Sequence, residues 1–177
     1  MREALILFAA GCLALAFESA LLAQLPAALV PALSLLFPVA AAVLLGPIEG
    51  LLVCAALGFG ADMFSGALLG QHAFLRLVEF AVVRALVGQL DLTRPIPFSI
   101  FAFGVALADA AGAAALIRFF LGGLVLDTHT LGVVALRSLA TAAAAPLVLA
   151  LARRVAEWGG LDEARREMRL ETKRPVI

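Results

Sequence analysis

The chain contains no asparagine and no tyrosine, and its single tryptophan, Trp158, lies close to the C-terminus. These absences leave few side chains for a pocket of the mixed aromatic and polar kind that captures small ligands. Charge is scarce as well, because Glu18 is the one charged residue between Ala4 and Ile48. The two cysteines, Cys12 and Cys54, are isolated and form no C-x-x-C pair, so we expect them to pack as small apolar side chains.

What the chain does contain is apolar bulk, since 64% of its 177 residues are hydrophobic. A soluble fold of this length has no interior large enough to hide so much apolar surface. A membrane-spanning helix needs about 20 mainly apolar residues, and the bilayer hides their surface. The composition therefore predicts an all-α, polytopic membrane protein.

Proline, glycine and short polar segments divide the apolar sequence into six predicted spans. Pro26 and Pro31 bracket the first turn, and Pro38 lies inside the second span, which we expect to be kinked or re-entrant. We interpret residues 1–152 as a six-helix transmembrane domain and residues 153–177 as a charged cytoplasmic tail. The six spans are predicted near residues 4–24, 29–46, 50–66, 71–90, 97–121 and 131–152.

The positions of the basic residues predict the orientation. Seven of the 13 Lys and Arg residues follow residue 152, and the loops at 25–28, 66–70 and 127–130 contain none. Basic residues concentrate on the cytoplasmic side of membrane proteins, so we expect both termini to be cytoplasmic. Arg118 and Arg137 approach the opposite surface, where we expect them to snorkel or to form ion pairs.

Ionisable residues inside spans are costly and point either to helix packing or to an ion or substrate path. Arg76 and Glu79 are three residues apart on one helical face and can pair. Asp62 ends the third span, so it can meet Arg76 across the turn, while Asp109 needs a basic partner on another helix. Eight such residues lie in or at the ends of the spans: Glu18, Asp62, Arg76, Glu79, Arg84, Asp109, Arg118 and Arg137.

Small residues mark positions where helices can approach closely. Gly66 and Gly70 flank the turn between the third and fourth spans, and we expect them to let the two backbones come together. A second row of small residues, spaced four apart in the fifth span, is a candidate partner interface. Its members are Gly104, Ala108 and Gly112.

Catalytic patterns are weak. Asp62, Ser65 and His72 lie close in sequence, but Ser65 lacks the G-x-S-x-G turn of hydrolases and fits a turn between helices better. The two histidines lack partners at metal-ligand spacing, and no phosphate-binding G-x-x-x-x-G-K-[ST] loop is present. We therefore expect no enzymatic activity, no metal, no cofactor and no nucleic-acid partner.

The segment GPIEGLLVCAALGFGADMFSGALLGQHAF, residues 46–74, resembles the family of the bacterial rod-shape-determining protein MreD. That family has a G-P-x-x-G connector followed by a span ending in G-x-x-x-D-x-x-S-G-x-x-L-G-x-x-A-[LF]. This chain departs from the family in being richer in alanine and poorer in aromatic residues. The matching residues are Gly46, Pro47, Gly50, Gly58, Asp62, Ser65, Gly66, Leu69, Gly70, Ala73 and Phe74.

The resemblance implies a non-enzymatic component of the bacterial inner membrane that helps to organise lateral peptidoglycan synthesis and cell shape. Its implied partners in this elongation complex are a single-span MreC-like protein and the elongation-specific glycosyltransferase and transpeptidase. The implied fold is that of the substrate-binding subunits of energy-coupling-factor transporters, with six short helices. That fold also supplies a rival function, a vitamin-capturing membrane subunit. An intramembrane protease or a lipid-headgroup enzyme ranks third, because no catalytic motif is present.

Overall fold

The computed structural model describes residues 2–65, 69–87, 89–90, 92, 94–122 and 127–159. Over these residues the chain is helical and has no β-strand, so the predicted all-α architecture is confirmed. The elements in chain order are α1 (Arg2–Leu22), the 3₁₀ helix η1 (Ala27–Leu29), α2 (Leu33–Leu44), α3 (Pro47–Ser65), α4 (Gln71–Leu86), α5 (Pro95–Leu121) and α6 (Thr128–Gly159).

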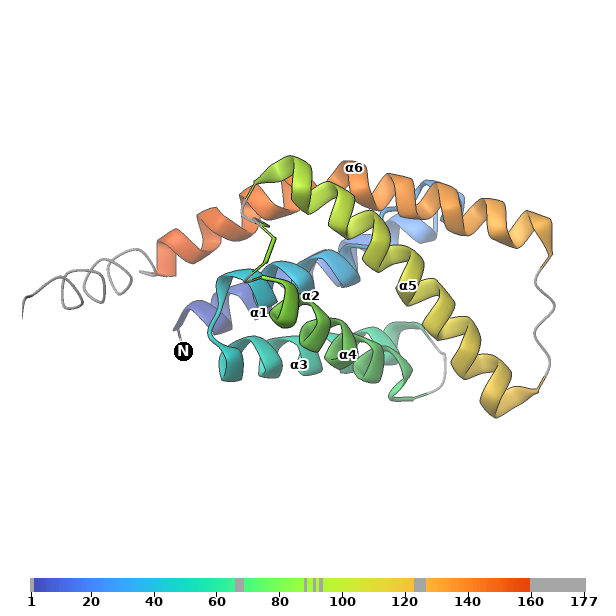
Figure 1. The fold of residues 1–177 in the computed structure, drawn as a ribbon, viewed down its shortest axis with the longest axis horizontal. Helices are drawn as coiled ribbons and strands as arrows, with labels where there is room; N and C mark the ends of the chain where they lie inside the picture. Colours follow the sequence, from blue (N-terminus) through green and yellow to red (C-terminus); the bar gives the residue numbers. More distant parts are fainter. Residues whose placement is uncertain are drawn as a thin grey trace, which may run out of the picture.

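The helices lie roughly lengthwise beside one another, and the start of α1 and the end of α6 lie at the same end of the bundle (Figure 1). We call this end the terminal end and the opposite one, where α5 finishes and α6 starts, the far end. The helix α6 runs past residue 152, and the tail from residue 160 onward lies outside the described residues.

Five helical segments are long and apolar enough to cross a membrane, so the multi-pass character is supported. They correspond to α1, η1 with α2, α3, α5 and α6. The remaining helix, α4, has 16 residues and contains Arg76, Glu79 and Arg84. At 1.5 Å per residue it is about 24 Å long, shorter than the hydrocarbon core of about 30 Å.

The second predicted span is not one continuous helix. The turn η1 is followed by extended backbone at Val30, and α2 begins only at Leu33. Pro31 explains the break, because the residue before a proline is pushed out of the helical conformation. Pro38, in contrast, lies inside α2. The resulting short helix forms the centre of the bundle, where residues 35–43 are all buried and α1, α3, α4 and α6 pack around it.

Charged side chains from neighbouring helices cap both ends of α2. At its start, the backbone N–H of Ser34 donates to Glu18 Oε2 on α1 at 2.7 Å, and Ala32 N–H donates to Thr141 Oγ1 on α6 at 3.0 Å. At its end, Arg84 Nη1 on α4 donates to the carbonyls of Ala42 and Leu45, both at 3.2 Å. A carboxylate at the start and a guanidinium at the end complement the helix dipole. These contacts give several of the terminal N–H and C=O groups of this 12-residue helix a partner in an otherwise apolar interior.

Candidate functional site

Asp62, the carboxylate of the motif in residues 46–74, caps α4 from the last turn of α3. Its Oδ2 accepts from the backbone N–H groups of Gly70 at 3.0 Å and Ala73 at 3.1 Å. Its Oδ1 accepts from the backbone N–H of His72 at 2.8 Å and from the His72 ring Nδ1 at 3.0 Å. The residue at the N-cap position is Gly70, which has no side chain, so a carboxylate from another helix performs the usual capping role.

This arrangement differs from the expected contact between Asp62 and Arg76. The side chain is held by backbone amides and by His72, whereas the ion pairs of Arg76 are with Glu79 and Asp109. The pairing of Asp62 with Arg76 is therefore wrong. The start of a helix presents several unbonded N–H groups at once, and one carboxylate can accept from more than one of them.

Close approach of α3 and α4 occurs at Gly58, not at Gly70 as expected. A Cβ at Gly58 would lie 2.7 Å from the Cα of Ala73 and 3.0 Å from the backbone oxygen of His72. At Gly70 a Cβ would meet nothing within 4 Å, but the backbone φ is +92°, in the left-handed region that favours glycine. Gly70 thus shapes the turn, and a larger side chain there would strain the backbone. Gly66 lies outside the described residues.

The connector of the motif starts α3. Pro47 is the first residue of α3, a position where its fixed φ suits a helix and its missing N–H is not needed. Gly50 N–H donates to the Gly46 carbonyl at 2.8 Å, and a Cβ at Gly50 would lie 2.9 Å from the Phe80 ring. The motif residues that the structure describes therefore begin α3, bring it against α4 and cap α4.

Arg76 is the centre of a buried charge cluster. It is 1% exposed, its Nη1 donates to Glu79 Oε2, and its Nη2 donates to Asp109 Oδ1 on α5 at 3.0 Å. The expected pairing of Arg76 with Glu79 and an inward partner for Asp109 are both present. Two atoms of the cluster, Arg76 Nε and Glu79 Oε1, are buried without a hydrogen-bond partner. A buried polar atom without a partner is unusual and identifies a place where water or another molecule can bind.

Of the two arginines near the far end, one is paired. Arg137 Nη2 on α6 donates to Glu18 Oε1 at 2.8 Å, so Glu18 both caps α2 and holds α6. Arg118 is exposed in the last turn of α5, where it can interact favourably with the C-terminal end of the helix dipole.

Asp62, Ser65 and His72, the residues that suggest a hydrolase, make other contacts. His72 and Asp62 are hydrogen-bonded, but the carboxylate also accepts three backbone N–H groups. The Ser65 hydroxyl donates to the backbone oxygen of Asp62 at 3.4 Å. Among the described residues, no group of three His, Cys, Asp or Glu side chains could hold a metal ion.

A polar cavity of about 220 Å³ lies between the start of α2, the start of α4, the second half of α5 and the first half of α6. Sequence reasoning missed this site, because its walls come from four separated segments. The ionisable residues among them were the available indication. Its polar lining consists of Ser34, His72, Arg76, Asp109, Arg137, Ser138 and Thr141.

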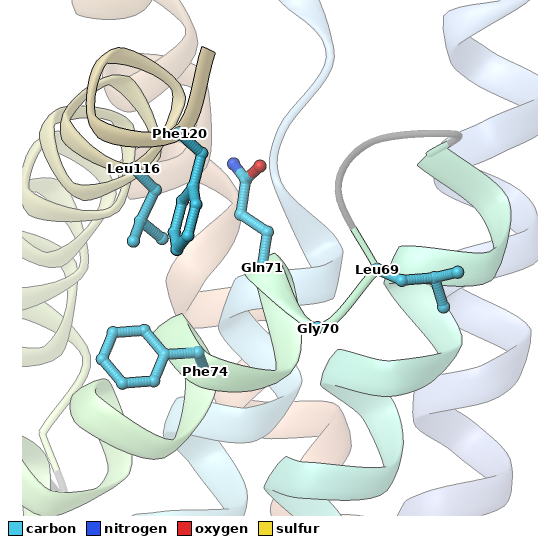
Figure 2. Close-up of a pocket in the computed structure, with 6 residues that line it drawn as sticks. All are labelled: Leu69, Gly70, Gln71, Phe74, Leu116 and Phe120. Atoms are coloured by element: carbon cyan, nitrogen blue, oxygen red, sulfur yellow. The ribbon is translucent and has the colours of Figure 1, made fainter. Parts of the chain in front are cut away.

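A second, mostly apolar pocket of about 400 Å³ lies between the start of α4 and the end of α5. Leu116 and Phe120 of α5 face Gln71 and Phe74 of α4 across it, whereas the Leu69 side chain points away (Figure 2). Gln71 is 7% exposed and its Oε1 has no partner, a feature that the sequence did not indicate. A third pocket, of about 640 Å³ and alanine-rich, lies between α5 and α6.

The small-residue row on α5 divides between two environments. Gly104 and Ala108 are exposed, and a Cβ at Gly104 would meet nothing within 4 Å. Gly112 turns inward, where a Cβ would lie 2.7 Å from Leu75 Cδ2 on α4. The outer part of the row can accept a neighbouring helix, while its last member packs within the bundle.

Scans of the chain against protein-family models, curated proteins and solved structures found no match.

Proposed function

We propose that the protein is a non-enzymatic, MreD-like component of the bacterial cell-elongation complex, which helps to organise lateral peptidoglycan synthesis. The observation that carries the proposal is the role of residues 46–74. Its described motif residues build the α3–α4 hairpin, and Asp62 is engaged by three backbone amides and a histidine. A motif devoted to shaping a helical hairpin suits a scaffold better than a catalyst.

The proposed site of action is the inner membrane, with both termini cytoplasmic. Arg2, Arg94, Arg153 and Arg154 belong to the helix ends at the terminal end of the bundle, which supports this orientation. Alkaline phosphatase fused after residue 177 is expected to be inactive, and green fluorescent protein fused there is expected to fluoresce. Strong phosphatase activity would mean an odd number of crossings.

The proposed partner is a single-span MreC-like protein, alongside the elongation-specific glycosyltransferase and transpeptidase. Gly104 and Ala108 offer it an exposed strip of α5 where two helix backbones can approach. The test is co-purification in detergent with a single-span MreC-like protein co-expressed with this chain. Retention of the partner is expected, and its complete loss under conditions that keep the bundle folded would contradict the proposal.

The rival function is the capturing subunit of an energy-coupling-factor transporter, for which the polar cavity is the candidate ligand site. Its volume of about 220 Å³ argues against a vitamin, because pockets for drug-sized ligands measure roughly 300–1,000 Å³. Calorimetry with thiamine, biotin and riboflavin separates the two functions. We expect no binding, and submicromolar affinity for one vitamin without recovery of a partner would favour the transporter.

A further inference from the structure

The polar cavity at the far end of the bundle has more hydrogen-bonding capacity than the protein itself uses. Two guanidinium groups line it, Arg76 from α4 and Arg137 from α6, and both have a buried Nε without a partner. Arg76 is 1% exposed and lines the cavity. One hydrogen bond from each of its terminal nitrogens goes to Glu79 and to Asp109, and these contacts fix the position of the group.

Acceptors face the same space. Asp109 lines the cavity, and its Oδ1 accepts the hydrogen bond from Arg76. His72 lines the cavity as well, while its Nδ1 is hydrogen-bonded to Asp62. The hydroxyl of Ser34 also lines the cavity and adds a group that can donate or accept.

The charges restrict what can bind. Three carboxylates, Glu18, Glu79 and Asp109, compensate the two guanidiniums in and beside the cavity. The cavity therefore offers a ligand both a cation and an anion as partners. A simple cation would leave the Nε donors of Arg76 and Arg137 unbonded, which is unfavourable for buried groups.

We propose that this cavity binds a small zwitterion, whose ammonium group pairs with Asp109 and whose anionic group accepts from Arg137, Arg76 and Ser34. The volume of about 220 Å³ suits a molecule of amino-acid size. The same chemistry occurs in a free amino acid and in the phosphoethanolamine headgroup of a lipid. The inference does not rest on the scaffold function, because binding is measured on the isolated protein.

The test uses the full chain, purified in detergent. Calorimetric titration with glycine is compared with titration by acetate and by ethylammonium, each of which carries one of the two charges. In parallel, native mass spectrometry follows protein released from nanodiscs that contain equal amounts of phosphatidylethanolamine and phosphatidylglycerol. Saturable heat with glycine alone identifies a free zwitterion, and selective retention of phosphatidylethanolamine identifies the headgroup. If neither result is obtained, the cavity holds only water, and the inference is overturned.

Variants link binding to the cavity. Asp109→Asn removes the carboxylate charge while Arg76 keeps Glu79, and we expect at least a tenfold loss of affinity. Ser34→Ala removes a hydroxyl but keeps the backbone N–H that Glu18 accepts, and it serves where Asp109→Asn fails to fold. The control is Asp127→Asn, an exposed carboxylate before α6. If both cavity variants bind with the same affinity as the parent protein, the ligand binds elsewhere.

Discussion

The α3–α4 hairpin and the α5–α6 pair use polar and small residues in opposite ways. In the hairpin, Gly58 brings the helices so close that a methyl group would lie 2.7 Å from the Ala73 Cα, and Asp62 accepts hydrogen bonds through both carboxylate oxygens. The second half of α5 instead has pockets of about 400 Å³ toward α4 and about 640 Å³ toward α6. The two helices of the pair separate toward the far end (Figure 1).

This difference indicates where folding and function reside. In the hairpin the polar groups bond backbone amides of the same chain, so changes there should alter the amount of folded protein. In the α5–α6 pair, Gly104 and Ala108 are exposed, so changes there should alter binding at little cost in stability. The predictions that follow each set a hairpin or core variant against a matched variant at a solvent-facing or lipid-facing position.

The largest effect is expected for Asp62→Ala, which leaves the N–H groups of Gly70, His72 and Ala73 without their acceptor. A buried unsatisfied donor costs about 1–3 kcal/mol, so we expect a loss of at least about 2 kcal/mol in thermal or denaturant unfolding. The matched control is Asp127→Ala, an exposed cap of α6 whose loss should cost about 1 kcal/mol. Equal losses would mean that Asp62 is no more than an ordinary surface cap.

Gly58→Ala tests the close approach in the hairpin. The added methyl meets the backbone of α4, which has little freedom to move, so a loss of about 1–3 kcal/mol is expected. Gly104→Ala on α5 meets nothing within 4 Å and should stabilise the helix by up to about 1 kcal/mol. Unfolding in detergent should show a lower unfolding free energy for Gly58→Ala and a higher one for Gly104→Ala. If both substitutions raise it, the close contact at Gly58 is refuted.

A smaller effect is expected at the end of α2. Arg84→Met keeps the apolar stem but removes the donors to the Ala42 and Leu45 carbonyls, which should cost about 1 kcal/mol. Arg118→Met, at an exposed position of α5, is the control and should change the unfolding free energy by less than about 0.5 kcal/mol. The capping role fails if Arg84→Met leaves the unfolding free energy unchanged.

Local sequence signals predicted the helices well. Apolar runs broken by Gly46-Pro47 and by the segment before Pro95 located α3 and α5, and the three-residue spacing predicted the pair of Arg76 and Glu79. The second span was expected to be kinked or re-entrant because of Pro38, but the helix is interrupted before α2, where Pro31 disfavours helix at the residue before it.

Interactions between distant segments could not be read from the sequence. Glu18 and Arg137 are 119 residues apart, and nothing in the local pattern of either indicates that one carboxylate pairs with α6 and caps α2. The acceptors of Arg84 are backbone carbonyls, which every residue carries and no sequence motif marks. The polar cavity depends on the same long-range packing, so its residues were recognised singly but not as one site.

The most direct test measures how much MreC-like partner is recovered relative to the amount of folded protein. Ala108→Phe fills the exposed strip of α5, and Ala16→Phe makes the same change at an exposed position of α1. Co-purification with the MreC-like protein, normalised to the monodisperse peak in gel filtration, should fall at least fivefold for Ala108→Phe and stay at the parental value for Ala16→Phe. Parental recovery for Ala108→Phe, or equal losses for both variants, would contradict the claim that the exposed face of α5 carries the function.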